Sequence, residues 1–189
     1  SWSAGGNLAT GRDSLAGCGT QSAGLCMGGN DGSVSDVTEE YDGTSWSAGG
    51  NLATAREKLA GCGTQSAGLC MGGTPGPSNV TEEYDGTSWS SGGNLATARS
   101  GPAGAGIQSA GLCFGGDDGS YSAVTEEYDG TSWSAGGNLA TARKYPAGCG
   151  TQTAGLCMGG YTGSNSDVTE EYNAGPGSYD ELFSPAQGL

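Results

Sequence analysis

Residues 1–10 read SWSAGGNLAT, and the same segment returns at 45–54, at 132–141 and, with Ser91 in place of alanine, at 88–97. The segment VTEEY also occurs four times, ending at Tyr41, Tyr84, Tyr128 and Tyr172. Tryptophan occurs once in each copy, at Trp2, Trp46, Trp89 and Trp133, so the repeat period is 43 or 44 residues. A fixed period of this length is typical of a repeat architecture. We therefore divide the chain into repeats at about 1–44, 45–87, 88–131 and 132–172, followed by a tail at 173–189.

Each repeat carries the signals of four short β-strands and almost none of a helix. Glycine accounts for 40 of the 189 residues, and no stripe of apolar residues at helical spacing can be drawn. In the first repeat, apolar or alternating runs predict strands at 15–19, 24–28, 37–41 and 45–48. A two-residue turn at Gly43-Thr44, with glycine supplying a positive φ, would place Tyr41 opposite Trp46.

Four-stranded antiparallel units at this period predict an all-β, four-bladed β-propeller in which each blade stacks on its neighbours. The chain begins with a fourth strand at 1–4 and ends with the first three strands of the last repeat. We therefore expect the N-terminal strand to pair with the last blade and close the ring. The last repeat lacks the Asp-Gly-Thr-Ser turn after Tyr172, as a blade with a borrowed strand would. A part of a larger propeller and an open array remain as alternatives.

The repeat also carries marks of a known family. Gly28-Gly29 ends the second strand, Tyr41-Asp42 ends the third, Trp46 lies on the fourth and Arg56 follows ten residues later. In these positions residues 1–172 resemble kelch-like repeats. The segments SWSAGGNLATAR and VTEEYDGT resemble a kelch-like subgroup seen in uncharacterised phage and bacterial proteins. The period is shorter than the ~50 residues usual for kelch, and the Gly-His and Trp-Asp marks of WD40 repeats are missing. A copper oxidase of the galactose-oxidase type, which is also a kelch protein, would need histidine ligands.

The composition excludes several classes of function. The chain has no histidine, so a Ser-His-Asp or Cys-His mechanism and a mixed Cys/His zinc site are not available. Six basic residues against twenty acidic ones give a net charge of −14, which argues against nucleic-acid binding. No run of about 20 apolar residues is present, so we expect no membrane insertion. We predict that the protein is not an enzyme and has no cofactor.

Six of the seven cysteines form three pairs with the spacing Cys-x7-Cys. The pairs are Cys18/Cys26, Cys62/Cys70 and Cys149/Cys157. If the intervening turn is centred near Ser22, the members of a pair lie opposite each other and a cross-strand disulfide fits. The third repeat has Ala105 in place of a partner, which predicts a free thiol at Cys113. Disulfides would imply an extracellular location; thiolate metal sites and buried, unbonded thiols are the alternatives.

Charged residues follow the same period. Arginine occurs once per repeat, at Arg12, Arg56, Arg99 and Arg143, and a Glu-Glu pair lies in each third strand. We interpret each arginine as one half of an Arg–Glu bridge inside its blade, although a four-fold ring of acid–base groups is the functional alternative. Adjacent glutamates on a strand point to opposite faces, so they cannot flank one glycosidic bond.

The loops differ between repeats on only one face of the predicted disc. The connections between strands two and three, and those leading into strand one, vary, whereas the other turns are nearly constant. This variable face is our candidate binding face, unless the variation is drift. Its candidate residues are Asn30, Asp31, Asp36, Asp117, Asp118, Tyr121, Tyr145, Tyr161 and Asp167. The aspartates faintly resemble calcium loops without matching the EF-hand spacing, and the tyrosines could stack on sugar rings.

These features together predict a non-enzymatic, extracellular or virion-surface structural or interaction module, which could be a subunit of a larger assembly. The alternative is a lectin-like propeller that binds glycans through repeated pockets. The expected partners are a protein or further copies of the chain, with a glycan as the alternative. The N-terminal strand could also insert into the next subunit and propagate a filament. We interpret 173–189 as a linker or docking arm.

Overall fold

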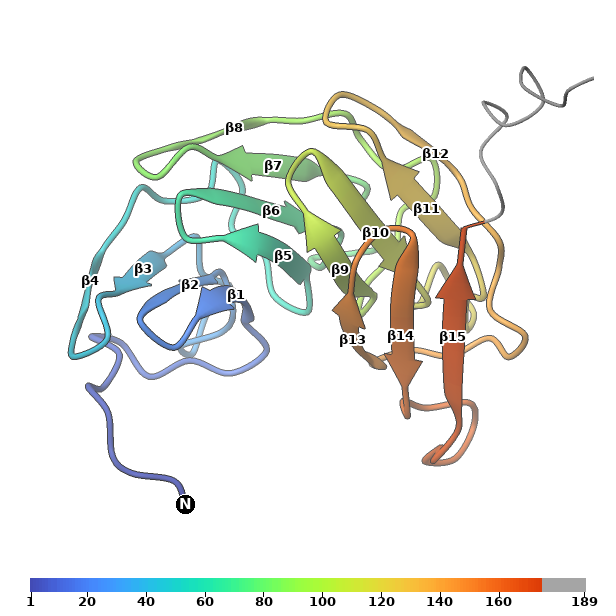
Figure 1. The fold of residues 1–189 in the computed structure, drawn as a ribbon, viewed down its shortest axis with the longest axis horizontal. Helices are drawn as coiled ribbons and strands as arrows, with labels where there is room; N and C mark the ends of the chain where they lie inside the picture. Colours follow the sequence, from blue (N-terminus) through green and yellow to red (C-terminus); the bar gives the residue numbers. More distant parts are fainter. Residues whose placement is uncertain (175–189) are drawn as a thin grey trace, which may run out of the picture.

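The computed structural model describes residues 1–174, and every regular element in that range is a β-strand (Figure 1). The first sheet contains β1 (Ala16–Thr20), β2 (Ala23–Met27), β3 (Thr38–Tyr41) and β4 (Trp46–Ala48). The second contains β5 (Ala60–Thr64), β6 (Ala67–Met71), β7 (Thr81–Tyr84) and β8 (Trp89–Ser91). The third contains β9 (Ala103–Ile107), β10 (Ala110–Phe114), β11 (Thr125–Tyr128) and β12 (Trp133–Ala135). The fourth contains β13 (Ala147–Gly150), β14 (Ala154–Met158) and β15 (Thr169–Asn173).

Each sheet is an antiparallel meander in which neighbouring strands follow one another in sequence. The turn between β3 and β4 has the predicted geometry, since Gly43 has a φ of +91° and Tyr41 lies opposite Trp46. The two rings are tilted by 36° with centroids 5.0 Å apart. Such cross-strand aromatic pairs stabilise the outer half of a blade. The predicted strands of the first repeat agree with the structure to within one residue at each end.

The four sheets are the blades of a four-bladed β-propeller, as predicted (Figure 1). The innermost strands pack side by side around the axis, β1 on β5, β5 on β9 and β9 on β13. Their small residues permit this close approach. A Cβ atom on Gly61 would lie 3.3 Å from that of Ala16, and one on Gly148 would lie 2.8 Å from the carbonyl oxygen of Gly104. Larger side chains would therefore separate the blades.

The predicted closure of the ring by the N-terminal strand is not present. Residues 1–4 form no strand and Trp2 is fully exposed. Within residues 1–174 the fourth sheet has only the three strands β13, β14 and β15. The blades form an arc whose first and last members do not meet (Figure 1). The chain is already fixed to the first blade at Ala9, whose N–H donates to Glu39 Oε2 at 2.7 Å. With the arc open, the segment before Gly5 therefore lies out of reach of β15.

The core is divided into three clusters, and each lies between two successive blades. Between the first and second blades, Leu25 and Met27 pack with Leu52, Leu59 and Tyr84. Equivalent residues fill the next two spaces. Because no blade encloses its own core, the stability of the array depends on contacts between neighbours. The predicted tail at 173–189 lies outside the described residues except for its first two, of which Asn173 ends β15.

Candidate functional site

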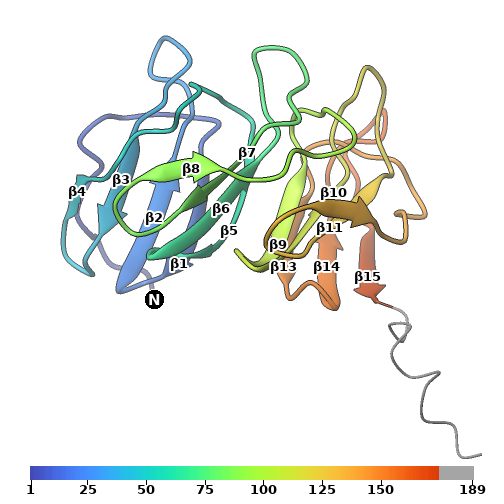
Figure 2. The same ribbon diagram turned by 90° about the horizontal axis from the view of Figure 1, so that it is seen from above.

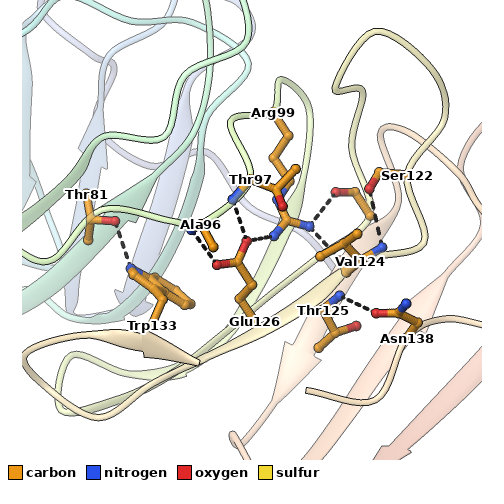
Figure 3. Close-up of polar contacts among 11 residues, drawn as sticks. Thr81, Ala96, Thr97, Arg99, Ser122, Val124, Thr125, Glu126, Trp133 and Asn138 are labelled. Carbon is orange, nitrogen blue, oxygen red and sulfur yellow. Dashed lines mark hydrogen bonds and ion pairs between the residues drawn. The ribbon is translucent and has the colours of Figure 1, made fainter. Parts of the chain in front are cut away.

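The buried charges form one network in each blade. Arg56, about 1% exposed, donates from Nη2 to Glu82 Oε1 at 2.8 Å and from Nη1 to the carbonyl oxygens of Gly72 and Val80 at 2.7 and 3.0 Å. The N–H of Ala53 donates to the other carboxylate oxygen at 2.7 Å. Figure 3 shows the same arrangement in the third blade. The ion pairs are Arg12–Glu39, Arg56–Glu82, Arg99–Glu126 and Arg143–Glu170.

This network is the Arg–Glu bridge that the period of the sequence indicates, and it is architectural. It ties the connection before the first strand of a blade to the second and third strands. The neighbouring glutamate faces the other side of the sheet, where Glu40 accepts a hydrogen bond of 2.5 Å from the hydroxyl of Tyr84 in the next blade. The two carboxylates of a blade are therefore separated by the strand and bound by different partners. They do not form an acid–base pair around one substrate.

The prediction of disulfides is wrong. The register of the β1–β2 hairpin pairs Cys18 with Leu25 and Cys26 with Gly17, because the turn centre lies half a residue before Ser22. Successive residues of a strand point to opposite faces, so the two thiols of a pair lie on different sides of the sheet. The same register holds in the second and fourth blades. The free thiols are Cys18, Cys26, Cys62, Cys70, Cys113, Cys149 and Cys157.

The thiols belong to the spaces between blades. Cys70 is fully buried and accepts a hydrogen bond from Arg56 Nη2 at 3.1 Å. Burial raises the pKa of the Cys70 thiol to about 12, although the arginine opposes the shift. Burial likewise raises the pKa of Cys18, which faces the second blade, to about 12. Cys149 occupies the equivalent inner-strand position in the last blade and is exposed, since no further blade packs on it within the described residues. These high pKa values make the buried thiols poor nucleophiles.

The variable face is assembled from paired loops. In each blade, the connection before the first strand forms a β-bridge with the loop after the second. The pairs are Asp13 with Asn30, Glu57 with Thr74, Ser100 with Asp117 and Lys144 with Tyr161. The long loops project from one side of the disc, and the short turns lie on the other (Figure 2). The structure thus gathers the variable segments on one face.

A line of backbone hydrogen bonds links the blades at the centre of this face. Lys58 N–H donates to Ser14 O at 2.8 Å, Gly101 N–H to Lys58 O at 2.8 Å, and Tyr145 N–H to Gly101 O at 2.9 Å. All four residues have a left-handed backbone, with φ between 53° and 59°. For the three that are not glycine this conformation costs about 1–2 kcal/mol each. The contacts between blades hold these residues in place around a shallow hollow at the axis.

An aromatic cluster lies at the corner between the third and fourth blades. The rings of Tyr121 and Tyr161 meet edge to face at 89°, with centroids 5.7 Å apart. Lys144 Nζ lies 5.2, 5.5 and 5.9 Å from the ring centroids of Tyr121, Tyr145 and Tyr161, within reach of cation–π attraction. It also donates to Asp117 Oδ2 at 3.2 Å. We call these five residues the tyrosine–lysine corner.

The charges of the corner stabilise each other. The hydrogen bond to Asp117 raises the pKa of Lys144. The pKa of Asp117 is lowered mainly by the hydrogen bond from the N–H of Gly119 and, to a smaller extent, by Lys144. The three tyrosines remain between 36% and 48% exposed, and Asn165 borders the same open hollow. The corner thus combines flat ring faces with a fixed cation, a carboxylate and an amide. Groups of these kinds bind polar ligands that have an apolar face.

The remaining candidate residues do not join this corner. Asn30 donates to Glu57 Oε2 at 2.6 Å, between the first two blades. Asp31 and Asp118 accept hydrogen bonds from residues of their own turns at 3.3 Å. Asp36 Oδ1 accepts from Asn51 at 3.4 Å, and Asp167 is exposed on the last blade. Within residues 1–174, no group of three or more acidic or cysteine side chains is placed to hold a metal ion.

Two residues of this candidate surface were missed by the sequence analysis. Lys144 precedes the candidate Tyr145, and Asn165 faces Tyr161 across the loop of the fourth blade. The signal for Lys144 was available, because it is one of only two lysines and lies in a variable connection. No signal in the sequence distinguishes Asn165 from the other polar loop residues.

The comparisons with known proteins give no relatives. No protein family matches the chain, and no curated protein is significantly similar to it. No helix in residues 1–174 is long and apolar enough to cross a membrane. The fold establishes the class of architecture, a four-bladed β-propeller, and the function has to be argued from the surfaces described above.

Proposed function

We propose that this chain is a non-enzymatic structural and interaction module of the kelch-like kind, which assembles with further copies of itself and presents its variable face to a partner. The proposal is supported by the use of the ionisable groups. The arginine and glutamate positions common to the blades are engaged in buried networks or in contacts between blades. The arginines and glutamates that the blades share are thus engaged in holding the blades together.

The observation that carries the assembly is the open edge of β15. Among the described residues this strand pairs with β14 on one side only, whereas β3, β7 and β11 each lie between two strands. An unpaired edge is a template for another strand. The extracellular or virion-surface location remains a prediction, and the absence of disulfides removes the argument that supported it.

Molar mass measured by light scattering over a range of protein concentrations tests this function. We expect masses above the 18.5 kDa of one chain that increase with concentration. One chain per particle at all concentrations would refute the assembly.

A lectin-like function is the second candidate, and the tyrosine–lysine corner favours it. Tyrosine rings that carry polar groups beside them can stack on the apolar face of a sugar. A glycan array should then give a signal that is lost in Tyr161→Ala. The matched control is Val34→Ala, which alters the position equivalent to Tyr121 on the first blade. An array that stays blank at high protein concentration, or equal losses in both variants, would refute the glycan-binding function.

A further inference from the structure

Three side chains, a glutamine, a tyrosine and a tryptophan, make recurring hydrogen bonds where one blade meets the next. In the first such interface, Gln65 Nε2 of the second blade donates to the carbonyl oxygens of Gly24 and Tyr41 at 3.1 and 2.9 Å. The hydroxyl of Tyr84 donates to Glu40 of the first blade at 2.5 Å. Gln108 with Tyr128, and Gln152 with Tyr172, repeat these bonds in the following two interfaces.

The third of these side chains is the tryptophan of the fourth strand. Trp89 Nε1 donates to Thr38 Oγ1 of the preceding blade at 2.9 Å, and Trp133 Nε1 donates to Thr81 Oγ1 at the same distance. Figure 3 shows the latter pair. The tryptophan ring also packs on the tyrosine of its own blade. The indole thus joins two blades, and it requires a fourth strand in the second of them.

The interface between the third and fourth blades lacks this indole. Thr125 Oγ1, equivalent to the two threonine acceptors, is buried and has no hydrogen-bond partner within the described residues. Beside it lies a hollow, partly open to solvent, that is lined by Leu112, Thr125, Leu139 and Tyr172. Thr125 and Tyr172 are the equivalents of the residues that hold the indole in the other interfaces. A buried acceptor without a donor is costly, so the hollow is a site for a tryptophan on a strand beside β15.

The two ends of the arc carry the two halves of one further interface. The first blade presents the donors Gln21, Tyr41 and Trp46, whose side chains make none of the recurring bonds within residues 1–174. The last blade presents the corresponding acceptors, Thr169, Glu171 and the carbonyl oxygens of Gly155 and Tyr172. On the last blade, positions that are buried in the three internal interfaces are exposed to solvent. Ala147, Cys149 and Thr169 are exposed, whereas their equivalents Ala103, Ala105 and Thr125 are at most 5% exposed.

We propose that the first blade of one copy docks on the last blade of a second copy. Residues 1–4 of the docking copy then become the fourth strand beside β15, and its Trp2 fills the hollow and donates to Thr125. Trp2 is available because it is fully exposed and belongs to the segment that forms the fourth strand elsewhere. The strand is added to an open edge, and the head-to-tail contact can continue from copy to copy.

A second copy satisfies these groups without distortion. The three internal interfaces are already formed with the arc open. If a chain closed on itself, the angle between blades would have to change at each of these interfaces. Docking of another copy repeats the existing geometry once more. This inference rests on the proposed function, because it names the surfaces through which the copies assemble.

The test is a pair of one-sided variants, each examined alone and then mixed. The head variant lacks residues 1–4 and carries Gln21→Ala and Trp46→Ala, and the tail variant carries Thr169→Val and Glu171→Gln together with Ala147→Glu. Each variant alone should have the mass of a single chain, which for the head variant is slightly below the 18.5 kDa of the unmodified chain. The mixture should form a dimer that grows no further, since the intact head of one variant fits the intact tail of the other. Ile107→Ser, which alters the exposed last residue of β9, should assemble like the unmodified chain.

The outcomes separate this inference from the proposed function. If the unmodified chain assembles and the two variants assemble as well, the proposed function stands and the docking surfaces are wrong. If the unmodified chain has the mass of one chain at every concentration, both are wrong. A photo-crosslinking residue in place of Trp2, in a mixture of isotopically light and heavy chains, gives an independent readout. We expect crosslinks from light to heavy chains at the hollow beside Thr125; crosslinks confined to one chain would mean self-closure and overturn the inference. Circular dichroism and thermal melting establish that each variant is folded.

Discussion

Replacing Arg56 by methionine tests whether the buried Arg–Glu networks hold the blades together. The guanidinium is 1% exposed and its partner carboxylate 2% exposed, so the substitution leaves Glu82 buried without its cation. Removal of one partner from a buried pair costs about 3–5 kcal/mol. The carbonyl oxygens of Gly72 and Val80 also lose their donor. We expect the loss to be a large part of a total stability that is typically about 5–15 kcal/mol.

Urea unfolding followed by tryptophan fluorescence measures this loss. The matched control is Lys58→Met, because the Lys58 side chain is 39% exposed on the variable face and pairs with Glu57 only at 3.5 Å. The control should lose less than about 1 kcal/mol. If Arg56→Met does not fold, the double variant Arg56→Met/Glu82→Met still decides the matter. It should be more stable than the single variant, since no unpaired charge remains. Equal losses in Arg56→Met and Lys58→Met would refute the reasoning.

Three further predictions follow from individual side chains. Under non-reducing, denaturing conditions all seven thiols should be alkylated, and in the folded chain Cys149 should react first; any disulfide would contradict the register of the hairpins. Burial, with a hydrogen bond to a glutamate, raises the pKa of Tyr84 and of Tyr128 from 10.0 to about 12. Their contribution to stability is therefore complete below pH 10 and is lost as the pH rises towards 12. The urea midpoint should fall over that interval, and less steeply in Tyr84→Phe; a flat profile would show that these hydroxyls are not linked to folding. Lys58→Gly should raise the melting temperature slightly, because the left-handed cost of about 1–2 kcal/mol exceeds the entropic cost of glycine, about 0.5–1 kcal/mol; a lower melting temperature would mean that the side chain of Lys58 supports the interface.

The repeated segments were sufficient to predict the blades, because period, turn residues and strand alternation are local properties. The Tyr41–Trp46 pair follows from the two-residue turn alone, and the structure has it. The disulfide prediction failed on a shift of half a residue. Cys18 and Cys26 would be opposite each other if the turn were centred on Ser22. The composition of a short turn does not indicate whether its centre lies on a residue or between two residues.

Closure of the ring could not be predicted because it depends on the angle between blades. That angle is set by the packing of strands such as β1 on β5, and small differences add up along the array. The sequence shows that Ser1–Ala4 matches a fourth strand, but it does not show whether the arc brings this segment to β15 of the same chain. The tyrosine–lysine corner was predictable in part. Tyr121, Tyr145 and Tyr161 could be assigned to one face, whereas their contact through Lys144 arises only when the third and fourth blades are packed together.

The central claim is that the open arc has complementary ends, and molar mass in solution tests it most directly. Light scattering on a sizing column should give a mass above 18.5 kDa that increases with protein concentration. The alkylation rate of Cys149 should fall in parallel, because the docked blade of the next copy covers that thiol. A mass of one chain at every concentration, with Cys149 equally reactive throughout, would contradict the account.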